Sequence, residues 1–596
     1  MANRGGTHRH HEDAVRPGGR PPHGGFMRTI VYSVVAASLL SMMGCGRESA
    51  PEPSPEEPEE SQAGLAVFDK VDLLFVVDNS MSMLEEQQVL ASSVEKLLRG
   101  MINPPCVSSA GDIILEPETP EAACPTGSFR RSAPVRDLHI GVISSNIGDL
   151  GSGTCSLSSP PDQAHLRTLG ESGPVATYQD LGFLAWDPDG ELTPAGESDF
   201  EALVASAVDI VAGVGETGCG YEMPLEAMNR FLVDPAPYAS LVQVDASGEP
   251  AGIDDALLAE RAAFLRPDSI VGVVLLSDEN DCSLDPTYGG LVLKTEPFFR
   301  ATSVCETDPD DACCVSCGME TPAGCTPDPI CADPKLPADN SNLRCFDQKR
   351  RYGVDFHYPT ARYVNALSAE EIDPSSLDYA QGEGSVQNPL LAGDRQAEHV
   401  IFTTITGVPW QDLVVNPNDP TSALKTPLQM ESDGSWAWLV GTGGGAPLDP
   451  FMIESVEKRL GVSPATGQST LSPSAPNGGD RSIPAADDLQ YACIFALAEP
   501  IPAGEGVCSC YEADDCGDPA CVDGVMVAAA ARPGTRQLEV ARALGAQSVV
   551  GSICPPVVVL PDTRETEQAV SPSSNYDAAL SQMNERVSEL LPELEQ

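Results

Sequence analysis

Oxygen-bearing side chains alternate in the stretch Asp78-x-Ser80-x-Ser82, directly after the nearly continuous apolar run 71–77. An unbroken run rich in Val, Leu and Phe predicts a strand buried on both faces, as in a parallel sheet covered by helices. Ser82, with Glu85 three residues later, is expected to cap the next helix. The three donors should therefore lie at the C-terminal edge of a sheet, where α/β proteins bind ligands. Such hard donors suit Mg²⁺, Mn²⁺ or Ca²⁺.

Two later segments complete a recognisable pattern. Thr217 lies in a Gly-rich loop before a helical pattern, and the run 269–278 is a second buried strand that ends in an acid. Together with the first stretch they resemble von Willebrand factor A-type domains, whose metal ion-dependent adhesion site joins Asp-x-Ser-x-Ser to a Thr and an Asp from two further loops. The resemblance implies that one divalent cation is held by Asp78, Ser80, Ser82, Thr217 and Asp278.

The same resemblance leads to a prediction about two cysteines. Cys219 closely follows the predicted Thr ligand, and Cys282 closely follows the last Asp ligand. If both loops converge on one cation, these cysteines come close together, and we expect a Cys219–Cys282 disulfide that braces the loops. Glu279 and Asp281 add carboxylates next to the site, where they either tune its affinity or face solvent.

Cysteine content and net charge indicate the compartment. The chain has 19 cysteines, and the 18 that remain without Cys45 are an even number, typical of disulfides in an oxidising environment. Cys106 and Cys124 are expected to close one loop. Cys314-x-x-Cys317 has the spacing of a zinc or redox pair, but its Asp, Pro and Gly neighbours and the lack of a second such pair favour disulfides. The net charge of −54 argues against nucleic acid as a partner.

The N-terminal residues indicate export. Residues 1–45 are interpreted as a leader and signal peptide, because Met27-Arg28 opens an apolar segment that is too short to span a membrane. The segment ends at Gly44-Cys45 and resembles a bacterial lipobox, which implies a lipid on Cys45 and an outer-membrane location. An ordinary secretory signal is the alternative. Residues 46–66, rich in Pro and Glu, are predicted to be an extended tether.

Strand and helix patterns alternate along residues 67–592, which predicts an α/β fold with a doubly wound, mainly parallel sheet flanked by helices, vWA-like or Rossmann-like. Two long cysteine-containing insertions, 283–398 and 410–535, are expected to interrupt it. The predicted core strands are 71–78, 137–145, 269–278, 399–407 and 547–553. The predicted helices are 82–99, 199–211, 222–232, 535–544 and 576–591.

The sequence contains none of the motifs His-Glu-x-x-His, Gly-x-Ser-x-Gly or Gly-x-x-x-x-Gly-Lys. We therefore expect a binding protein and not an enzyme. The leading hypothesis is a surface lipoprotein that binds a protein or glycan partner with an acidic group through Mg²⁺, Mn²⁺ or Ca²⁺, and that touches the membrane only through its lipid. The alternatives are an envelope hydrolase with catalytic groups in the insertions, and a structural envelope component.

Overall fold

The computed structural model describes residues 65–148, 161–244, 247–286, 299–334, 343–372, 385–483, 487–502, 518–522, 524–557 and 573–592. The predicted leader, the lipidation site Cys45 and nearly all of the predicted tether lie outside these ranges. Within the ranges, every helix is too short or too polar to cross a membrane.

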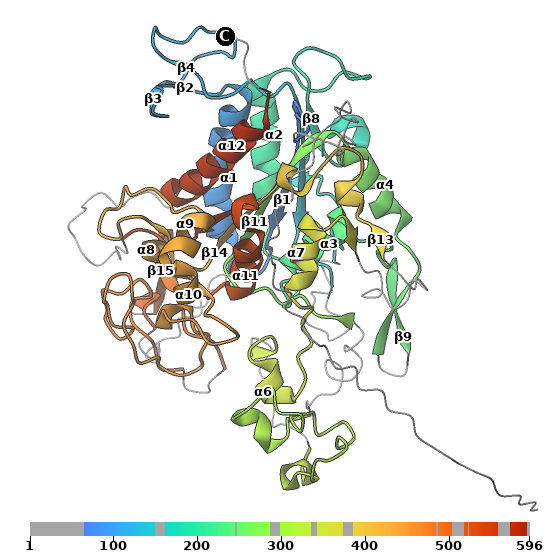
Figure 1. Cartoon of the computed structure of the whole chain (residues 1–596), viewed down its shortest axis with the longest axis vertical. Coiled ribbons are helices and arrows are strands. Elements are labelled where there is room, and N and C mark those ends of the chain that lie inside the picture. The colour runs from blue at the N-terminus through green and yellow to red at the C-terminus, as the bar shows by residue number, and fades with distance from the viewer. Residues whose placement is uncertain are drawn as a thin grey trace, which may run out of the picture. The chain divides into compact units, whose positions relative to one another are not determined.

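A six-stranded sheet with the order β18-β14-β11-β1-β5-β8 forms the centre of the fold (Figure 1). All neighbouring pairs are parallel except β5 with β8, which is antiparallel. The α/β class and the mainly parallel sheet are thus confirmed, whereas β8 lies in a segment that shows no strand pattern. The strands are β1 (Lys70–Val77), β5 (Asp137–Ser144), β8 (Leu184–Trp186), β11 (Ser269–Ser277), β14 (Val400–Thr406) and β18 (Ser548–Ser552).

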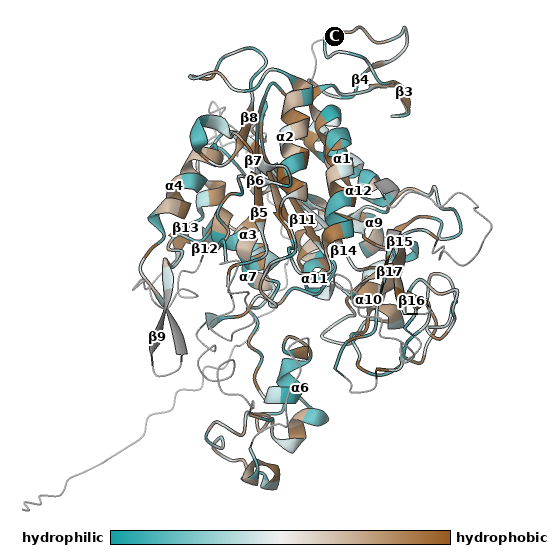
Figure 2. Cartoon of the chain, turned by 180° about the vertical axis from the view of Figure 1, so that it is seen from behind, coloured by the Kyte–Doolittle hydropathy of each residue, from teal (hydrophilic) through white to brown (hydrophobic). Residues whose placement is uncertain are grey.

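Helices cover the sheet, and their packing explains the unbroken apolar runs of the strands. Figure 1 shows α1, α2 and α12 on one side and α3, α4 and α7 on the other, and α11 packs against α7 and β14. Figure 2 shows the apolar strands between these layers. The helices are α1 (Leu84–Ile102), α2 (Phe200–Ala212), α3 (Pro224–Leu232), α4 (Asp255–Phe264), α7 (Ala361–Ser368), α11 (Thr535–Leu544) and α12 (Ser573–Leu590).

The start of α1 differs from the prediction. The helix begins at Leu84, its N-cap residue is Met83, and no side chain caps it. Ser82 is therefore not the capping residue, and its hydroxyl lies 3.3 Å from that of Ser80. The expected capping box with Glu85 is wrong because the helix begins one residue later than a Ser82 cap requires, so both serines belong to the loop at the sheet edge.

Shorter helices and strands lie outside the central sheet and its covering helices. A three-stranded antiparallel sheet has the order β15-β17-β16. The limits of the two insertions stay predictions. The remaining elements are β2 (Cys106–Val107), β3 (Ile113–Leu115), β4 (Phe129–Arg130), β6 (Leu169–Gly170), β7 (Gly173–Pro174), β9 (Ser240–Val244), β10 (Ser247–Ala251), β12 (Glu371–Ile372), β13 (Val386–Gln387), β15 (Cys493–Pro502), β16 (Cys521–Val522), β17 (Val525–Ala531), α6 (Gln348–Tyr352), α8 (Trp410–Leu413), α9 (Pro427–Asp433) and α10 (Ser435–Leu439).

Disulfides staple the outer segments, as the cysteine content predicts. Cys106 and Cys124 pair as expected, and Cys314 and Cys317 each form a disulfide with a different partner. The described disulfides are Cys106–Cys124, Cys282–Cys345, Cys305–Cys314, Cys313–Cys325, Cys317–Cys331 and Cys493–Cys554.

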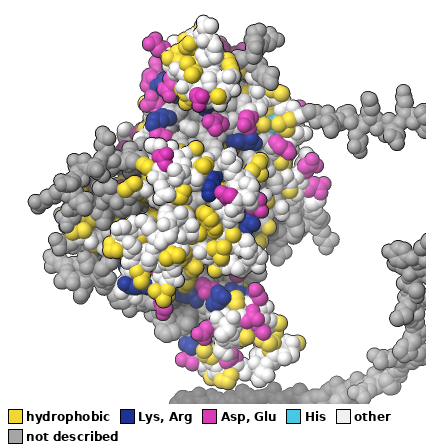
Figure 3. All heavy atoms as spheres, turned by 60° about the vertical axis from the view of Figure 1, so that its left-hand side comes forward, with side chains coloured by type: hydrophobic (Ala, Val, Ile, Leu, Met, Phe, Trp, Pro, Cys, Tyr) yellow, Lys and Arg dark blue, Asp and Glu magenta, His cyan; other side chains and the backbone are white. Residues whose placement is uncertain are grey.

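On the face shown in Figure 3, acidic side chains are scattered among neutral and apolar ones.

Candidate metal centre

The loop after β1, residues 78–82, lies beside the ends of β5 and β11. Asp78 is fully buried, and its backbone N–H donates to the carbonyl oxygen of Leu276 at 2.9 Å. The Ser277 hydroxyl donates to Asp78 Oδ2 at 2.6 Å, while the Ser145 hydroxyl and the Ser80 backbone N–H donate to Oδ1 at 3.2 Å and 2.9 Å. Three parallel strands thus fix the orientation of this carboxylate at the C-terminal edge of the sheet.

Gln87, on the first turn of α1, fastens the Thr217 loop to the loop after β1. Its carboxamide nitrogen donates to the carbonyl oxygens of Asp78 at 2.8 Å and Gly215 at 2.9 Å. Its carboxamide oxygen accepts from the Gly215 N–H at 3.1 Å. A single buried side chain therefore bridges two loops that are more than one hundred residues apart in the sequence.

A glycine makes the second contact between these loops. The Gly218 backbone N–H donates to the Asn79 carbonyl oxygen at 2.9 Å. A Cβ atom on Gly218 would lie 2.4 Å from the Asn79 side-chain oxygen, so a larger residue would push the loops apart. Thr217, the residue before this contact, is exposed, whereas Asp78 below it is buried. The Thr217 side of the site therefore faces solvent.

Asp278, at the end of β11, is a buried carboxylate without a compensating donor. Its side chain is fully buried, and neither carboxylate oxygen has a hydrogen bond of ordinary geometry. Burial raises the pKa of Asp278 well above its usual value, and the negative charges of Glu279 and Asp78 raise it further. The nearby Ser82 hydroxyl lowers this pKa by a smaller amount. A carboxylate in this position needs a cation or a proton.

Two further buried carboxyl groups surround the same place. Glu86 on α1 has no ordinary hydrogen bond to either oxygen, and burial followed by the charge of Asp278 raises its pKa well above the usual value. Burial, followed by the charges of Glu279 and Asp78, raises the pKa of Glu222 in the same way. Burial also raises the pKa of Asp78 to about 6. The site therefore gathers four buried carboxyl groups whose ionised forms are all disfavoured, so that each favours a proton or a nearby positive charge.

The positively charged side chain of Arg532 contacts this region, but it is bonded to carboxylates other than Asp78 and Asp278. Arg532 donates to Glu279 Oε1 at 2.5 Å and to Asp488 Oδ1 at 2.9 Å, and its backbone N–H donates to the Asp278 carbonyl oxygen at 2.7 Å. Asp281 accepts from the Leu225 N–H at the start of α3. Glu279 and Asp281 thus have structural partners. The Asp278 carboxylate is buried without an ordinary hydrogen bond, and the other predicted ligands offer carboxylate or hydroxyl oxygens, which are the donors that a hard divalent cation prefers, so the residues fit such an ion.

The structure brings Asp78, Ser82 and Asp278 together, and the Thr217 loop contacts the loop after β1, which carries Asp78, Ser80 and Ser82. The sequence interpretation missed Glu86, Glu222 and Gln87. A signal for Glu86 exists, because Leu90 lies four residues later on the same buried face of α1. No comparable signal marks Glu222, which precedes its helix.

The predicted Cys219–Cys282 disulfide is wrong. Cys282 forms a disulfide with Cys345, and Cys219 forms a disulfide with a cysteine other than Cys282. The physical reason is the path of the chain after β11. Residues 283–285 run beside 356–358, with an antiparallel bridge between Leu284 and His357, and this pairing carries Cys282 toward the 345 segment.

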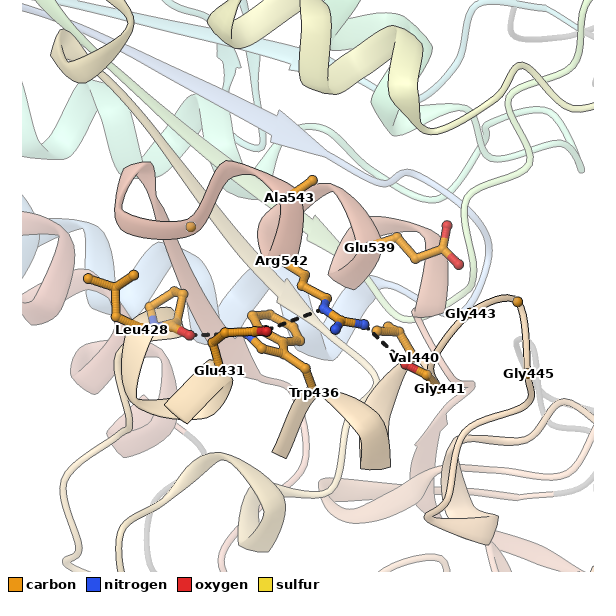
Figure 4. A pocket seen from close by; sticks show the side chains of 13 residues that line it. Leu428, Glu431, Trp436, Val440, Gly441, Gly443, Gly445, Glu539, Arg542 and Ala543 are labelled. Atoms are coloured by element: carbon orange, nitrogen blue, oxygen red, sulfur yellow. Dashed lines mark hydrogen bonds and ion pairs between the residues drawn. The ribbon is translucent and has the colours of Figure 1, made fainter. Parts of the chain in front are cut away.

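A cavity of about 540 Å³ lies between α9, α10 and the C-terminal half of α11 (Figure 4). Two of its charged groups are paired with each other, because Arg542 contacts Glu431 Oε2 at 3.5 Å, and Arg542 also donates to the Gly441 carbonyl oxygen at 3.1 Å. The start of α11 contacts Asn280, and Arg542 lies seven residues further along, about 10 Å at 1.5 Å per residue. The cavity is therefore separate from the carboxylate cluster.

Comparison with known proteins adds no relative. No family model, no curated protein and no solved structure matches this chain.

Proposed function

We propose that this protein binds a partner at the cell surface through a divalent cation held in a site of the von Willebrand factor A type. The observation that carries the proposal is the Asp278 carboxylate, which is fully buried beside Asp78 with no hydrogen bond of ordinary geometry to either oxygen. A group of this kind is costly to bury unless a positive charge joins it. The six-stranded, mainly parallel sheet with flanking helices is compatible with that family.

Mg²⁺ is the ion that fits best, with Mn²⁺ or Ca²⁺ as substitutes, because every proposed donor is a carboxylate or hydroxyl oxygen. Asp78 and Asp278 supply the negative charge from below, and Ser80, Ser82 and Thr217 supply neutral oxygens, directly or through water. Few charged ligands leave the ion with residual positive charge. An acidic group of a protein or glycan partner then completes its coordination from the exposed Thr217 side.

The proposed location is the outer surface of a bacterial envelope, with the chain anchored by a lipid on Cys45. The disulfides of the described segments support an oxidising compartment. We propose no catalytic step and no nucleic-acid partner, and the only contact with the membrane is the lipid.

The test compares two aspartates of the same β-strand region. Asp78→Ala removes a proposed ligand, whereas Asp69→Ala removes an exposed carboxylate at the opposite end of β1. We expect calorimetric titration with Mg²⁺ or Mn²⁺ to show binding to the wild type and to Asp69→Ala, and none to Asp78→Ala, with unchanged circular dichroism. Equal binding by Asp78→Ala would refute the site.

A second experiment tests the partner. Immobilised protein is incubated with extracts of native surfaces and neighbouring cells, in Mg²⁺ or in EDTA, and Asp78→Ala serves as the control. We expect a species that is retained by the wild type in Mg²⁺ and released by EDTA. Hydrolysis of glycans or peptides that persists in Asp78→Ala would instead favour an enzyme with its catalytic groups elsewhere in the chain.

A further inference from the structure

A second group of potential metal ligands lies beyond the end of β11, apart from the oxygen site. The Sγ atoms of Cys282 and Cys345 and a ring nitrogen of His357 lie within 4.8 Å of one another. Around a zinc ion, bond lengths of about 2.3 Å to sulfur and about 2.0 Å to nitrogen place tetrahedral ligand atoms about 3.5–3.8 Å apart. The three atoms are thus close enough to share one ion after small side-chain rotations.

His357 provides the second, independent observation. Its Nδ1 lies 2.9 Å from Asp355 Oδ1, while its Nε2 is buried and has no hydrogen-bond partner in the described part of the chain. The side chain is 9 % exposed. Metal-ligating histidines are typically held in this way, with one nitrogen on a carboxylate and the other on the ion. A disulfide between the two cysteines leaves Nε2 without a role, whereas a metal ion uses it.

The backbone holds the three ligands in place without the ion. The Cys282 N–H donates to the Glu222 carbonyl oxygen at 2.8 Å, and the Tyr358 N–H donates to the Ser283 carbonyl oxygen at 3.0 Å. Gln348 accepts from the Phe356 N–H at 2.7 Å and so ties the segment before His357 to the helix that follows Cys345. The site is therefore built on paired segments and needs no large rearrangement.

We propose that the dithiol form of this protein binds a zinc-class transition metal ion through Cys282, Cys345 and His357, and that formation of the Cys282–Cys345 disulfide excludes the ion. Three protein ligands leave a fourth position for water. The site is distinct from the proposed oxygen site, and it is independent of the proposed function, because thiolate and imidazole ligands select softer ions than carboxylate and hydroxyl oxygens do.

The two forms are related by a balanced exchange. A dithiol reductant transfers two electrons and two protons to the disulfide, so the S–S bond breaks, two thiols form, and the reductant becomes a disulfide. The zinc ion then displaces one proton from each thiol, and the two protons go to solvent. Two thiolates neutralise the ion, so the occupied site adds no net charge to the buried region.

The experiment uses the full chain with Co²⁺ as a coloured substitute for zinc. The protein is reduced with a water-soluble phosphine in the absence of oxygen, the phosphine is removed, and Co²⁺ is added. We expect a thiolate-to-cobalt charge-transfer band in the reduced wild type that zinc abolishes, and none in the oxidised protein. Reduction also frees other cysteines, so the double variant Cys282→Ser/Cys345→Ser sets the background. A signal equal to this background would overturn the proposal.

Two further variants separate ligand from scaffold. His357→Gln should weaken zinc binding by about 100-fold or more, and Asp355→Asn by about tenfold, because the second residue acts through the imidazole. His165→Gln is the matched control, since His165 also contacts carboxylates but lies away from the cysteines, and it should bind zinc as the wild type does. Unchanged affinity in His357→Gln would show that the imidazole is not a ligand.

A measurement on the unmutated chain avoids any loss of folding in the variants. The reduced protein is alkylated with iodoacetamide with and without zinc, and peptides that contain Cys282 and Cys345 are quantified. We expect zinc to slow the alkylation of both cysteines but not that of Cys106 and Cys124. Equal protection of all four, or of none, would contradict the proposed site.

Discussion

The two ends of β1 bury aspartates in opposite ways. At the N-terminal end, Asp72 accepts from the side chain and the backbone N–H of Arg266, both at 2.8 Å, and Arg395 lies 3.8 Å from its Oδ2. At the C-terminal end, Asp78 accepts only from hydroxyls and a backbone N–H, and Asp278 beside it has no ordinary hydrogen bond. Arginine side chains contact the aspartate at the first end, whereas at the second end the Arg532 side chain is bonded to Glu279 and Asp488 and the Asp278 carboxylate has no ordinary hydrogen bond.

The difference separates a carboxylate that is bonded to arginine from carboxylates that have only neutral donors or none. Asp72, Asp78 and Asp278 are all fully buried, so burial alone does not distinguish the two ends. The presence of arginine does, because the Arg266 guanidinium already balances the negative charge of Asp72, so a metal ion is not needed at the N-terminal end. Under the proposed function, a cation from solvent completes the C-terminal end, which lies at the carboxyl edge of a parallel sheet, where α/β proteins bind ligands.

The largest expected effect comes from breaking the closed end. Arg266→Ala leaves Asp72 buried without its main partner, and we expect the free energy of unfolding to fall by about 3–5 kcal/mol. Urea denaturation measures this loss. The control Arg586→Ala removes a surface ion pair with Glu589 and should cost at most about 1 kcal/mol. A small loss in Arg266→Ala would mean that the two ends do not differ as proposed.

Supplying the missing charge at the open end should have the next largest effect. Mg²⁺ at one hundred times its dissociation constant should raise the free energy of unfolding of the wild type by about 2.7 kcal/mol. Asp278→Asn lacks the charge that attracts the ion and should gain almost nothing. Thermal unfolding in Mg²⁺ and in EDTA provides the comparison, and equal stabilisation of both proteins would contradict the assignment of Asp278.

The open end should also respond to pH. The folded-state pKa of Asp78 is about 6 against a usual 3.8, because burial disfavours the carboxylate. In EDTA, the stability from its protonated form is full below about pH 4 and is lost as the pH rises through 6. Mg²⁺ requires the ionised form, so its affinity should fall about tenfold per pH unit below 6. Calorimetry at several pH values tests this, and a flat profile would exclude Asp78 as a ligand.

The smallest change in stability is expected for Glu86, a residue outside the motif. Glu86→Gln removes one of the unbalanced buried carboxyls near Asp278 while it preserves the shape of the side chain. We expect the metal-free protein to become more stable by about 1 kcal/mol at neutral pH, because one source of repulsion disappears. Denaturation in EDTA measures the gain. A loss of stability would show that Glu86 has a partner that outweighs its repulsion from Asp278.

The core strands were predictable because each is a continuous apolar run, and β1, β5, β11, β14 and β18 all lie within two residues of their predicted limits. The edge strand β8 was not, since three antiparallel residues leave no periodic signal. The helix α4 also escaped prediction.

At the candidate site, the motif residues were predictable in position but their surroundings were not. Gln87 and Glu222 act through contacts between segments far apart in sequence, and no local pattern encodes such contacts. The prediction of a Cys219–Cys282 disulfide is wrong for the same reason. The partner of Cys282 is set by the alignment of residues 283–285 with 356–358, and sequence spacing says nothing about that alignment.

Arg532 joins the small antiparallel sheet to the open end. It directly follows β17, its backbone holds the Asp278 carbonyl oxygen and its side chain holds Glu279. The Cys493–Cys554 disulfide ties the neighbouring strand β15 to the chain just after β18. Under the proposed function, a displacement of the small sheet would be transmitted through Arg532 to Asp278 and Glu279, and it would change how the cation is held.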